Sequence, residues 1–154
     1  MTSLPSEVLR ALQGKTLVTA ESITGGGIGQ ALTSVPGASA VYKGGIVSYC
    51  DDVKASVLGV DEALLRSLGA VSAPVAEAMA RGARKVLAAD VAVAVTGLAG
   101  PDADSFGNPV GTVFIGFADE KRCVSREFHF SGDRDAIRGM TRDAALRLIL
   151  DMKK

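Results

Sequence analysis

The segment Val91-Ala-Val-Ala-Val95 constrains the fold of this chain more than any other. It is apolar throughout, and it is bounded by Asp90 on one side and by Thr96-Gly97 on the other. A short apolar run with such boundaries is typical of a central strand that is buried on both faces. Each face then needs a covering layer, which favours a sheet enclosed between two layers of helices.

The rest of the chain can supply those layers. Apolar spacing, caps and breakers predict helices near residues 4–12, 28–35, 61–68, 72–87 and 133–152, with another short helix after Asp51-Asp52. The inner face of the helix that Ser72 caps is expected to carry Val75, Met79, Ala83, Val86 and Leu87. Strands are predicted at 15–20, 46–49, 91–95, 111–118 and 122–130, the last two forming a hairpin. We therefore expect a three-layer α/β/α sandwich with a mixed, mostly parallel sheet, in a single domain over residues 1–154.

Composition excludes several classes of function. The 154 residues include 17 Lys and Arg and 17 Asp and Glu, so the formal net charge is zero, which argues against a nucleic-acid partner. No stretch approaches the length of a membrane span, and the start does not resemble a leader. Cys50 and Cys123 are too few for a disulfide framework, so a cytoplasmic protein is expected. The single His129 excludes any site built from several histidines, and no metal ligands or cofactor motif are predicted.

Three predicted strands end in small or polar residues, where α/β sheets usually bind their ligands. The Gly-rich segments fit neither known phosphate fingerprint. The segment Gly14-Lys15-Thr16 precedes a strand, and Leu9 stands where a Walker loop needs its first glycine. Gly25-Gly26-Gly27 does not continue as a dinucleotide-binding pattern, because Gln30 stands where that pattern needs its third glycine. We interpret the triple glycine as a turn whose backbone N–H groups could hold an anion or a developing oxyanion.

Ser22 is the candidate nucleophile of the chain. It lacks the flanking glycines of a nucleophile elbow, and His129 lies in an alternating strand, so a Ser-His-Asp triad is poorly supported. Lys54 could instead act as the base if burial lowers its pKa, with Tyr49 relaying a proton or orienting the pair. The structural alternatives are that Ser22 or Thr24 caps a helix, that Lys54 is solvated and that Tyr49 is a core residue.

Arginines recur at four-residue spacing in the last predicted helix. Arg134, Arg138 and Arg142 would form a stripe on one face, which could grip a phosphate or could simply be balanced by neighbouring aspartates.

Several blocks, in order and over nearly the whole chain, resemble the C-terminal domain family of CinA, the competence/damage-inducible protein. They are Thr19–Gly26, Gly44–Tyr49 with Lys54, Leu58–Val60, Gly69–Ser72, Val95–Pro101, Pro109–Val113 and Phe130–Arg134. Stand-alone members of this family include nicotinamide mononucleotide amidohydrolases. The resemblance therefore implies hydrolysis of the carboxamide of nicotinamide mononucleotide to nicotinic acid mononucleotide and ammonia.

The resemblance also implies roles for individual residues. The family's serine nucleophile falls on Ser22, its tyrosine on Tyr49 and its lysine base on Lys54. Our working hypothesis adds the backbone N–H groups near Gly25 to Gly27 as oxyanion donors. The implied substrate contacts are Thr24, Gly25, Gly26, Thr96, Gly97, Gly100, Arg134 and Arg138. A homodimer or higher homo-oligomer is expected on the same ground.

The chain departs from the family pattern at two places. Ile23 stands where the family usually has cysteine, and Cys50-Asp51 stands where it often has Ser-Asn. Both changes lie beside the proposed catalytic side chains and bear on the shape and charge of the pocket. The alternative function is a nucleotide-binding or regulatory module of the same family that lacks turnover.

Overall fold

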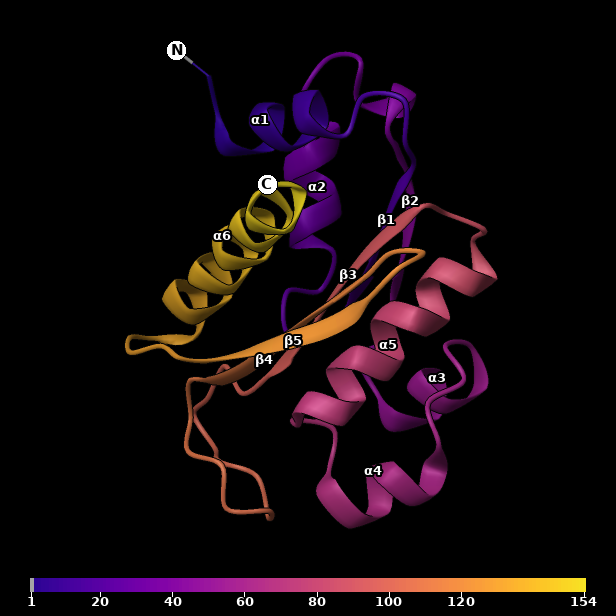
Figure 1. Ribbon diagram of the computed structural model, residues 1–154. Coiled ribbons are helices and arrows are strands. Elements are labelled where there is room, and N and C mark those ends of the chain that lie inside the picture. The colour runs from indigo at the N-terminus through magenta and orange to yellow at the C-terminus, as the bar shows by residue number, and fades with distance from the viewer. Residues whose placement is uncertain (1) are drawn as a thin grey trace.

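The apolar run lies at the centre of a five-stranded sheet, as strand β3 (Figure 1). The computed structural model describes residues 2–154. Its strands are β1 (Leu17–Glu21), β2 (Tyr42–Val47), β3 (Val91–Gly97), β4 (Thr112–Ala118) and β5 (Cys123–His129). Its helices are α1 (Leu4–Ala11), α2 (Gly27–Thr33), α3 (Asp51–Ser56), α4 (Glu62–Leu68), α5 (Ala73–Val86) and α6 (Arg134–Lys153), with a 3-10 turn over Ala38–Ala40.

The sheet is mixed, as predicted, with the order β2-β1-β3-β4-β5. Strand β1 pairs in parallel with both β2 and β3, whereas β3–β4 and β4–β5 are antiparallel. Two of the four strand pairs are therefore parallel, whereas a mostly parallel sheet was predicted. The difference arises because the hairpin of β4 and β5 extends the same sheet beyond β3. The carboxyl ends of β1, β2 and β3 lie at one end of the sheet.

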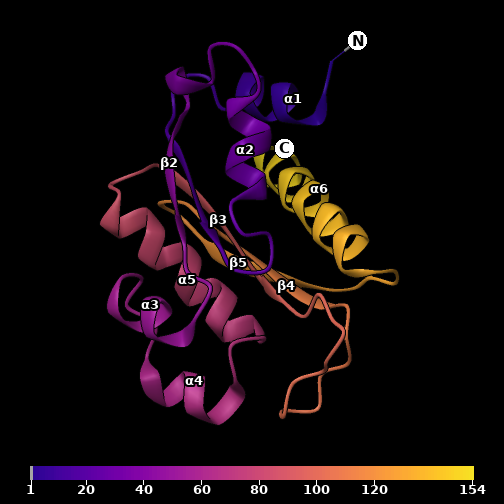
Figure 2. The same cartoon turned by 180° about the vertical axis from the view of Figure 1, so that it is seen from behind.

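Helices cover both faces of the sheet, which gives the predicted three layers. Figures 1 and 2 show α1, α2 and α6 on one face and α3, α4 and α5 on the other. Alternation along β3 divides the core accordingly, since Val91, Val93 and Val95 belong to the core on the α6 side and Ala92 and Ala94 to the core on the α5 side. None of the helices in the described part of the chain combines the length and apolar character needed to cross a membrane.

Small residues let α5 lie directly on the sheet. A Cβ at Gly116 of β4 would come within 2.4 Å of the Ala76 carbonyl oxygen of α5. Ser72 caps α5 as predicted, because its side chain accepts a hydrogen bond from the Val75 N–H. Val75, Met79 and Ala83 are buried as expected, but the prediction for Val86 was wrong: 53% of it is exposed at the end of the helix.

Strand β2 begins four residues before its predicted start at Ile46. The predicted strand begins after Gly44-Gly45, but both glycines lie inside β2. Gly45 is needed there because a Cβ would come within 2.2 Å of Thr19 Oγ1 on the neighbouring β1. The strand also ends at Val47, before Tyr49.

Candidate active site

A cavity of about 440 Å³ lies where the carboxyl ends of β1 and β3 meet the loop after β2. This is the convergence that the sequence predicted. The cavity lies between β1, which the chain continues to β2 on one side, and β3, which it continues to β4 on the other side. Ligands usually bind at such a point in α/β sheets. The cavity is lined by Ser22, Ile23, Tyr49, Asp51, Lys54, Ala70, Val71, Thr96–Asp102 and Arg134.

Ser22 and Lys54 are in direct contact in this cavity. Lys54 Nζ lies 3.0 Å from Ser22 Oγ, 2.7 Å from the Ser48 carbonyl oxygen and 3.4 Å from the Tyr49 carbonyl oxygen. Only 1% of Lys54 and 7% of Ser22 are exposed. The structure therefore brings the predicted nucleophile and base together, although they are 32 residues apart.

The three oxygens around Lys54 suit a neutral amine. A neutral amine has two N–H groups, which can be donated to the two carbonyls, and one lone pair, which can accept the Ser22 hydroxyl proton. Burial lowers the pKa of Lys54 below its ordinary value, while the nearby Asp51 carboxylate and Cys50 partly oppose this shift. The 3.0 Å contact places Lys54 within reach of the Ser22 proton, and the lowered pKa of Lys54 increases the share of the neutral amine that can accept it.

Glu21 holds the turn that presents Ser22. Its carboxylate is 2% exposed and accepts hydrogen bonds from the N–H groups of Ile28 (2.8 Å) and Gly29 (2.9 Å) and from the Thr24 hydroxyl (2.6 Å). It therefore fills the N-terminus of α2, which has no side-chain cap of its own. Sequence reasoning missed this role, although an acidic residue directly before a Gly-rich helix start was a usable signal.

The glycine turn is largely closed to a ligand. The Gly25 N–H donates to the Ser22 carbonyl and the Gly27 N–H to the Thr24 carbonyl, so neither is available to an oxyanion. Thr24, Gly25 and Gly26 are absent from the cavity lining, and the Thr24 hydroxyl is used by Glu21. The structure thus gives this segment a positioning role in place of the predicted substrate contacts.

Arg138 supports the same turn from α6. Its guanidinium donates to the carbonyl oxygens of Ile23 (3.1 Å) and Thr24 (3.2 Å), and it does not line the cavity. Both hydrogen bonds of Arg138 go to the protein backbone, so a contact between Arg138 and substrate stays a prediction. Arg142, one turn further on, meets Asp143 instead, so the arginine stripe divides into separate roles.

Arg134 is the member of the stripe that reaches the cavity. It donates to the Gly100 carbonyl oxygen (2.6 Å) and to the Tyr49 hydroxyl (3.0 Å). Tyr49 is 63% exposed and its hydroxyl accepts a hydrogen bond from Arg134, so its role in relaying a proton or orienting the Ser22–Lys54 pair stays a prediction. What contacts Lys54 is the Tyr49 backbone carbonyl.

The loop after β3 forms the opposite wall. Thr96 donates its hydroxyl to the Ala70 carbonyl oxygen, which joins this wall to the segment before α5. Gly97 lies where a Cβ would come within 2.7 Å of a Val113 methyl group, and Gly100 has a φ of +90° that favours glycine. All three line the cavity as predicted, with Thr96 already engaged by the protein.

The histidine and the two cysteines are not part of the cavity lining. His129 is on the edge strand β5, where its Nε2 is 2.6 Å from a Glu127 carboxylate oxygen. Cys50 and Cys123 are both free thiols. Within residues 2–154, no three His, Cys, Asp or Glu side chains are grouped so that they could hold a metal ion.

Comparison with known proteins agrees with this geometry. A family model, the CinA C-terminal domain, matches residues 1–153. The chain belongs to the CinA C-terminal domain family. A CinA superfamily protein from Klebsiella pneumoniae has a solved structure with a TM-score of 0.94 at 32% identity, covering 97% of this chain and 95% of that one.

The curated relatives fall into two size classes. A CinA-like protein of Geobacter metallireducens is 52% identical over 86% of this chain, but the chain spans only 32% of that protein. The nicotinamide-nucleotide amidohydrolase PncC of Pseudomonas putida is 48% identical over 88% of this chain and 85% of its own length. The described fold thus corresponds to part of the first protein and to most of the second.

Proposed function

We propose that this chain hydrolyses the carboxamide of nicotinamide mononucleotide, giving nicotinic acid mononucleotide and ammonia. The observation that carries the proposal is the 3.0 Å contact between Lys54 Nζ and Ser22 Oγ inside the cavity. The name of the Pseudomonas putida relative indicates the nucleotide whose amide this pair would attack.

In the first half-reaction, Lys54 accepts the hydroxyl proton while Ser22 Oγ bonds to the carboxamide carbon. The tetrahedral intermediate then loses ammonia, whose extra proton comes from Lys54, and an ester on Ser22 is left. In the second half-reaction Lys54 takes a proton from water, the hydroxide attacks the ester, and Ser22 recovers its proton as the acid is released. Overall, one water is consumed and one ammonia is produced.

Two groups around the cavity would complete the chemistry. The Ile23 N–H follows the nucleophile directly and would donate to the oxyanion, a common position for such a donor. Arg134 would bind the substrate phosphate, because its guanidinium has five N–H groups and only two protein acceptors are in contact with it.

The test is to incubate the purified protein with nicotinamide mononucleotide and measure both products. We expect ammonia and nicotinic acid mononucleotide in equal amounts, and a kcat/KM lower by about tenfold or more for nicotinamide riboside, which lacks the phosphate. A protein that is stabilised by the mononucleotide but releases no ammonia would contradict the proposal and support the alternative binding module.

A further inference from the structure

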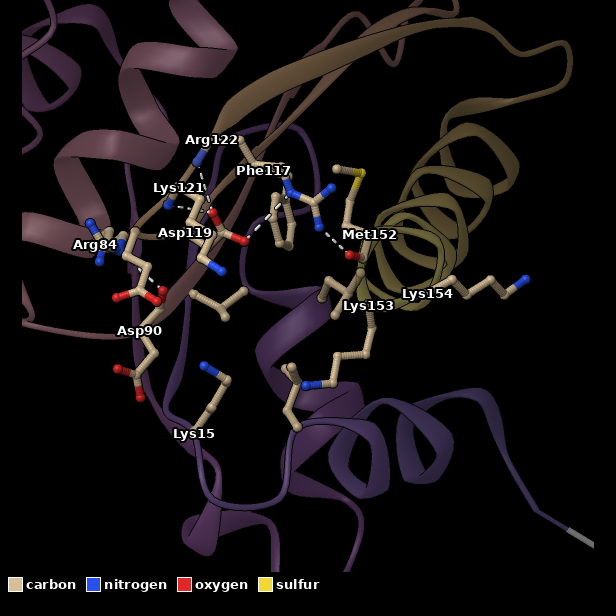
Figure 3. Close-up of a pocket in the computed structure, with 14 residues that line it drawn as sticks. Lys15, Arg84, Asp90, Phe117, Asp119, Lys121, Arg122, Met152, Lys153 and Lys154 are labelled. Carbon is tan, nitrogen blue, oxygen red and sulfur yellow. Dashed lines mark hydrogen bonds and ion pairs between the residues drawn. The ribbon is translucent and has the colours of Figure 1, made fainter.

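A second cavity lies at the opposite end of the sheet from Ser22. It has a volume of about 360 Å³ and is formed by the segments that lead into β1 and β3, the turn between β4 and β5, and the end of α6. Figure 3 shows Lys15, Lys121 and Lys153 extending from three of these segments toward a common space. None of the residues of this cavity is shared with the one around Ser22.

The charge of this second cavity is strongly positive, although the whole chain is neutral. Its lining contains six cationic side chains, Lys15, Arg84, Lys121, Arg122, Lys153 and Lys154, and three acidic ones, Asp90, Asp119 and Glu120. Six cations less three acids leave the lining with an excess of three positive charges, which in a chain of zero net charge is offset by acidic residues elsewhere. The positive charge is therefore concentrated at this end of the sheet.

Two of the three acidic groups are already engaged by the protein. Asp90 accepts hydrogen bonds from the backbone N–H and hydroxyl of Thr16. Asp119 accepts from the backbone N–H groups of Lys121 and Arg122 and forms an ion pair with the Arg122 side chain. The third, Glu120, is exposed at the tip of the turn.

Three of the lysines, by contrast, form no close ion pair in the described part of the chain, although the charge of Lys15 acts on Asp90. Within the described residues, Lys15, Lys121 and Lys153 have no carboxylate within 4.0 Å. Lys153 alone could be explained by the negative C-terminal end of α6, but Lys15 and Lys121 come from other parts of the chain. Three like charges around one cavity repel each other, and an anion bound between them would relieve that repulsion.

The base of the cavity is apolar and carries a fixed arginine. The guanidinium of Arg122 lies 5.7 Å from the centre of the Phe117 ring and donates to the Met152 carbonyl oxygen. Leu12, Val91 and Ile149 complete this base. A cavity lined by both apolar and cationic side chains suits a ligand that joins phosphate groups to a flat organic group. Its volume is within the range of small-molecule sites.

We propose that this cavity binds a small organic phosphate with at least two negative charges, such as a nucleoside diphosphate. The test is isothermal titration of the full chain with ADP, with adenosine as the uncharged comparison and inorganic pyrophosphate as the probe of the phosphate contacts alone. We expect ADP and pyrophosphate to bind, adenosine not to bind, and the affinity for ADP to fall as salt is raised.

Variants separate this cavity from the proposed substrate site. The double variant Lys15→Ala, Lys121→Ala should weaken ADP binding at least tenfold, whereas Lys85→Ala, which removes an exposed lysine of α5 outside the cavity, should not change it. Arg134→Gln should also leave this binding intact. ADP binding that survives in the double variant but is lost in Arg134→Gln would overturn the proposal, as would the absence of ADP binding to the wild-type chain; neither result depends on amidohydrolase activity.

Discussion

At the scale of single residues, Lys54 departs most from the usual behaviour of its type. Lysine is rarely fully buried, yet Lys54 is 1% exposed and surrounded by two carbonyls and the Ser22 hydroxyl. Burying a charged amine is costly, so burial lowers the pKa of Lys54 and shifts its titration toward the neutral form. This cost is explained if the neutral amine is needed as a base.

The first prediction concerns the pH dependence of activity. Because neutral Lys54 is required, kcat/KM should rise with pH to a plateau. The midpoint of this rise should lie below the ordinary pKa of lysine. Lys54→Arg should lower kcat/KM by a factor on the order of 10³ or more, since a guanidinium stays charged. A flat pH profile in the wild type, measured by ammonia release with a stable buffer series, would contradict the assignment of Lys54 as base.

The same shift predicts how stability depends on pH. Between the lowered pKa of folded Lys54 and about 10.4, the unfolded chain binds a proton that the folded chain does not, so the free energy of unfolding rises with pH. The contribution is lost as pH falls through the folded pKa. Urea unfolding of the wild type and of Lys54→Met over this range should therefore show a difference that changes with pH, and a constant difference would oppose the shift.

A third prediction concerns Glu21. Replacing Glu21 by Gln removes the charge that four donors share and turns an amide NH₂ toward the N-terminus of α2. We expect the free energy of unfolding to fall by about 3 kcal/mol and kcat to fall with it, because the Ser22 turn loses its anchor. Glu62→Gln, an exposed change on α4, is the control and should stay within about 0.5 kcal/mol of the wild type.

At the scale of secondary-structure elements, α6 links three parts of the molecule. Its first residue, Arg134, reaches the cavity, Arg138 holds the Ser22 turn, and its last turn lines the second cavity. Helical geometry explains these three contacts. Residues four apart lie on one face of the helix, but they are displaced along its axis and so meet different neighbours.

A fourth prediction follows from Arg138. Arg138→Ala should lower kcat about tenfold or more with a smaller change in KM, since the guanidinium holds the Ile23 and Thr24 carbonyls and does not line the cavity. Arg142→Ala removes the next arginine of the same face, which pairs only with Asp143, and should leave kcat unchanged. Equal effects of the two substitutions would show that Arg138 has no special role in positioning Ser22.

Elements with strong local signals were predictable from the sequence. The apolar run of β3, the Ser72 cap of α5 and the hairpin of β4 and β5 all lie where spacing and caps placed them. Strand β2 starts earlier than predicted, and its Gly45 is explained by close approach to β1, which is a contact between distant segments. Local pattern cannot distinguish a glycine required by a turn from one required by a neighbouring strand.

At the scale of the whole molecule, the two ends of the sheet differ in character. One end holds Ser22 and Lys54 with Arg134 at the rim, and the other holds the lysine-rich cavity. The sequence predicted the first by strand ends and family resemblance. It could not predict the second, because Lys15, Lys121 and Lys153 are far apart in the chain and share no motif. The cytoplasmic location and the homo-oligomeric state stay predictions.

The direction of a side chain within the site could not be predicted from the sequence. A residue type and its spacing indicate that Tyr49 or Thr24 lies near Ser22, but not which way a hydroxyl points. The Tyr49 hydroxyl faces Arg134 and the Thr24 hydroxyl faces Glu21, and both directions depend on partners brought in by the fold.

If Ser22 and Lys54 form the catalytic pair of an amidohydrolase, removing the Ser22 hydroxyl must abolish the release of ammonia. Ammonia release from nicotinamide mononucleotide is compared between the wild type, Ser22→Ala and the control Ser67→Ala, which removes an exposed hydroxyl of α4. We predict that Ser22→Ala loses activity by a factor on the order of 10³ or more while Ser67→Ala matches the wild type. Ammonia release by Ser22→Ala at the wild-type rate would contradict the account.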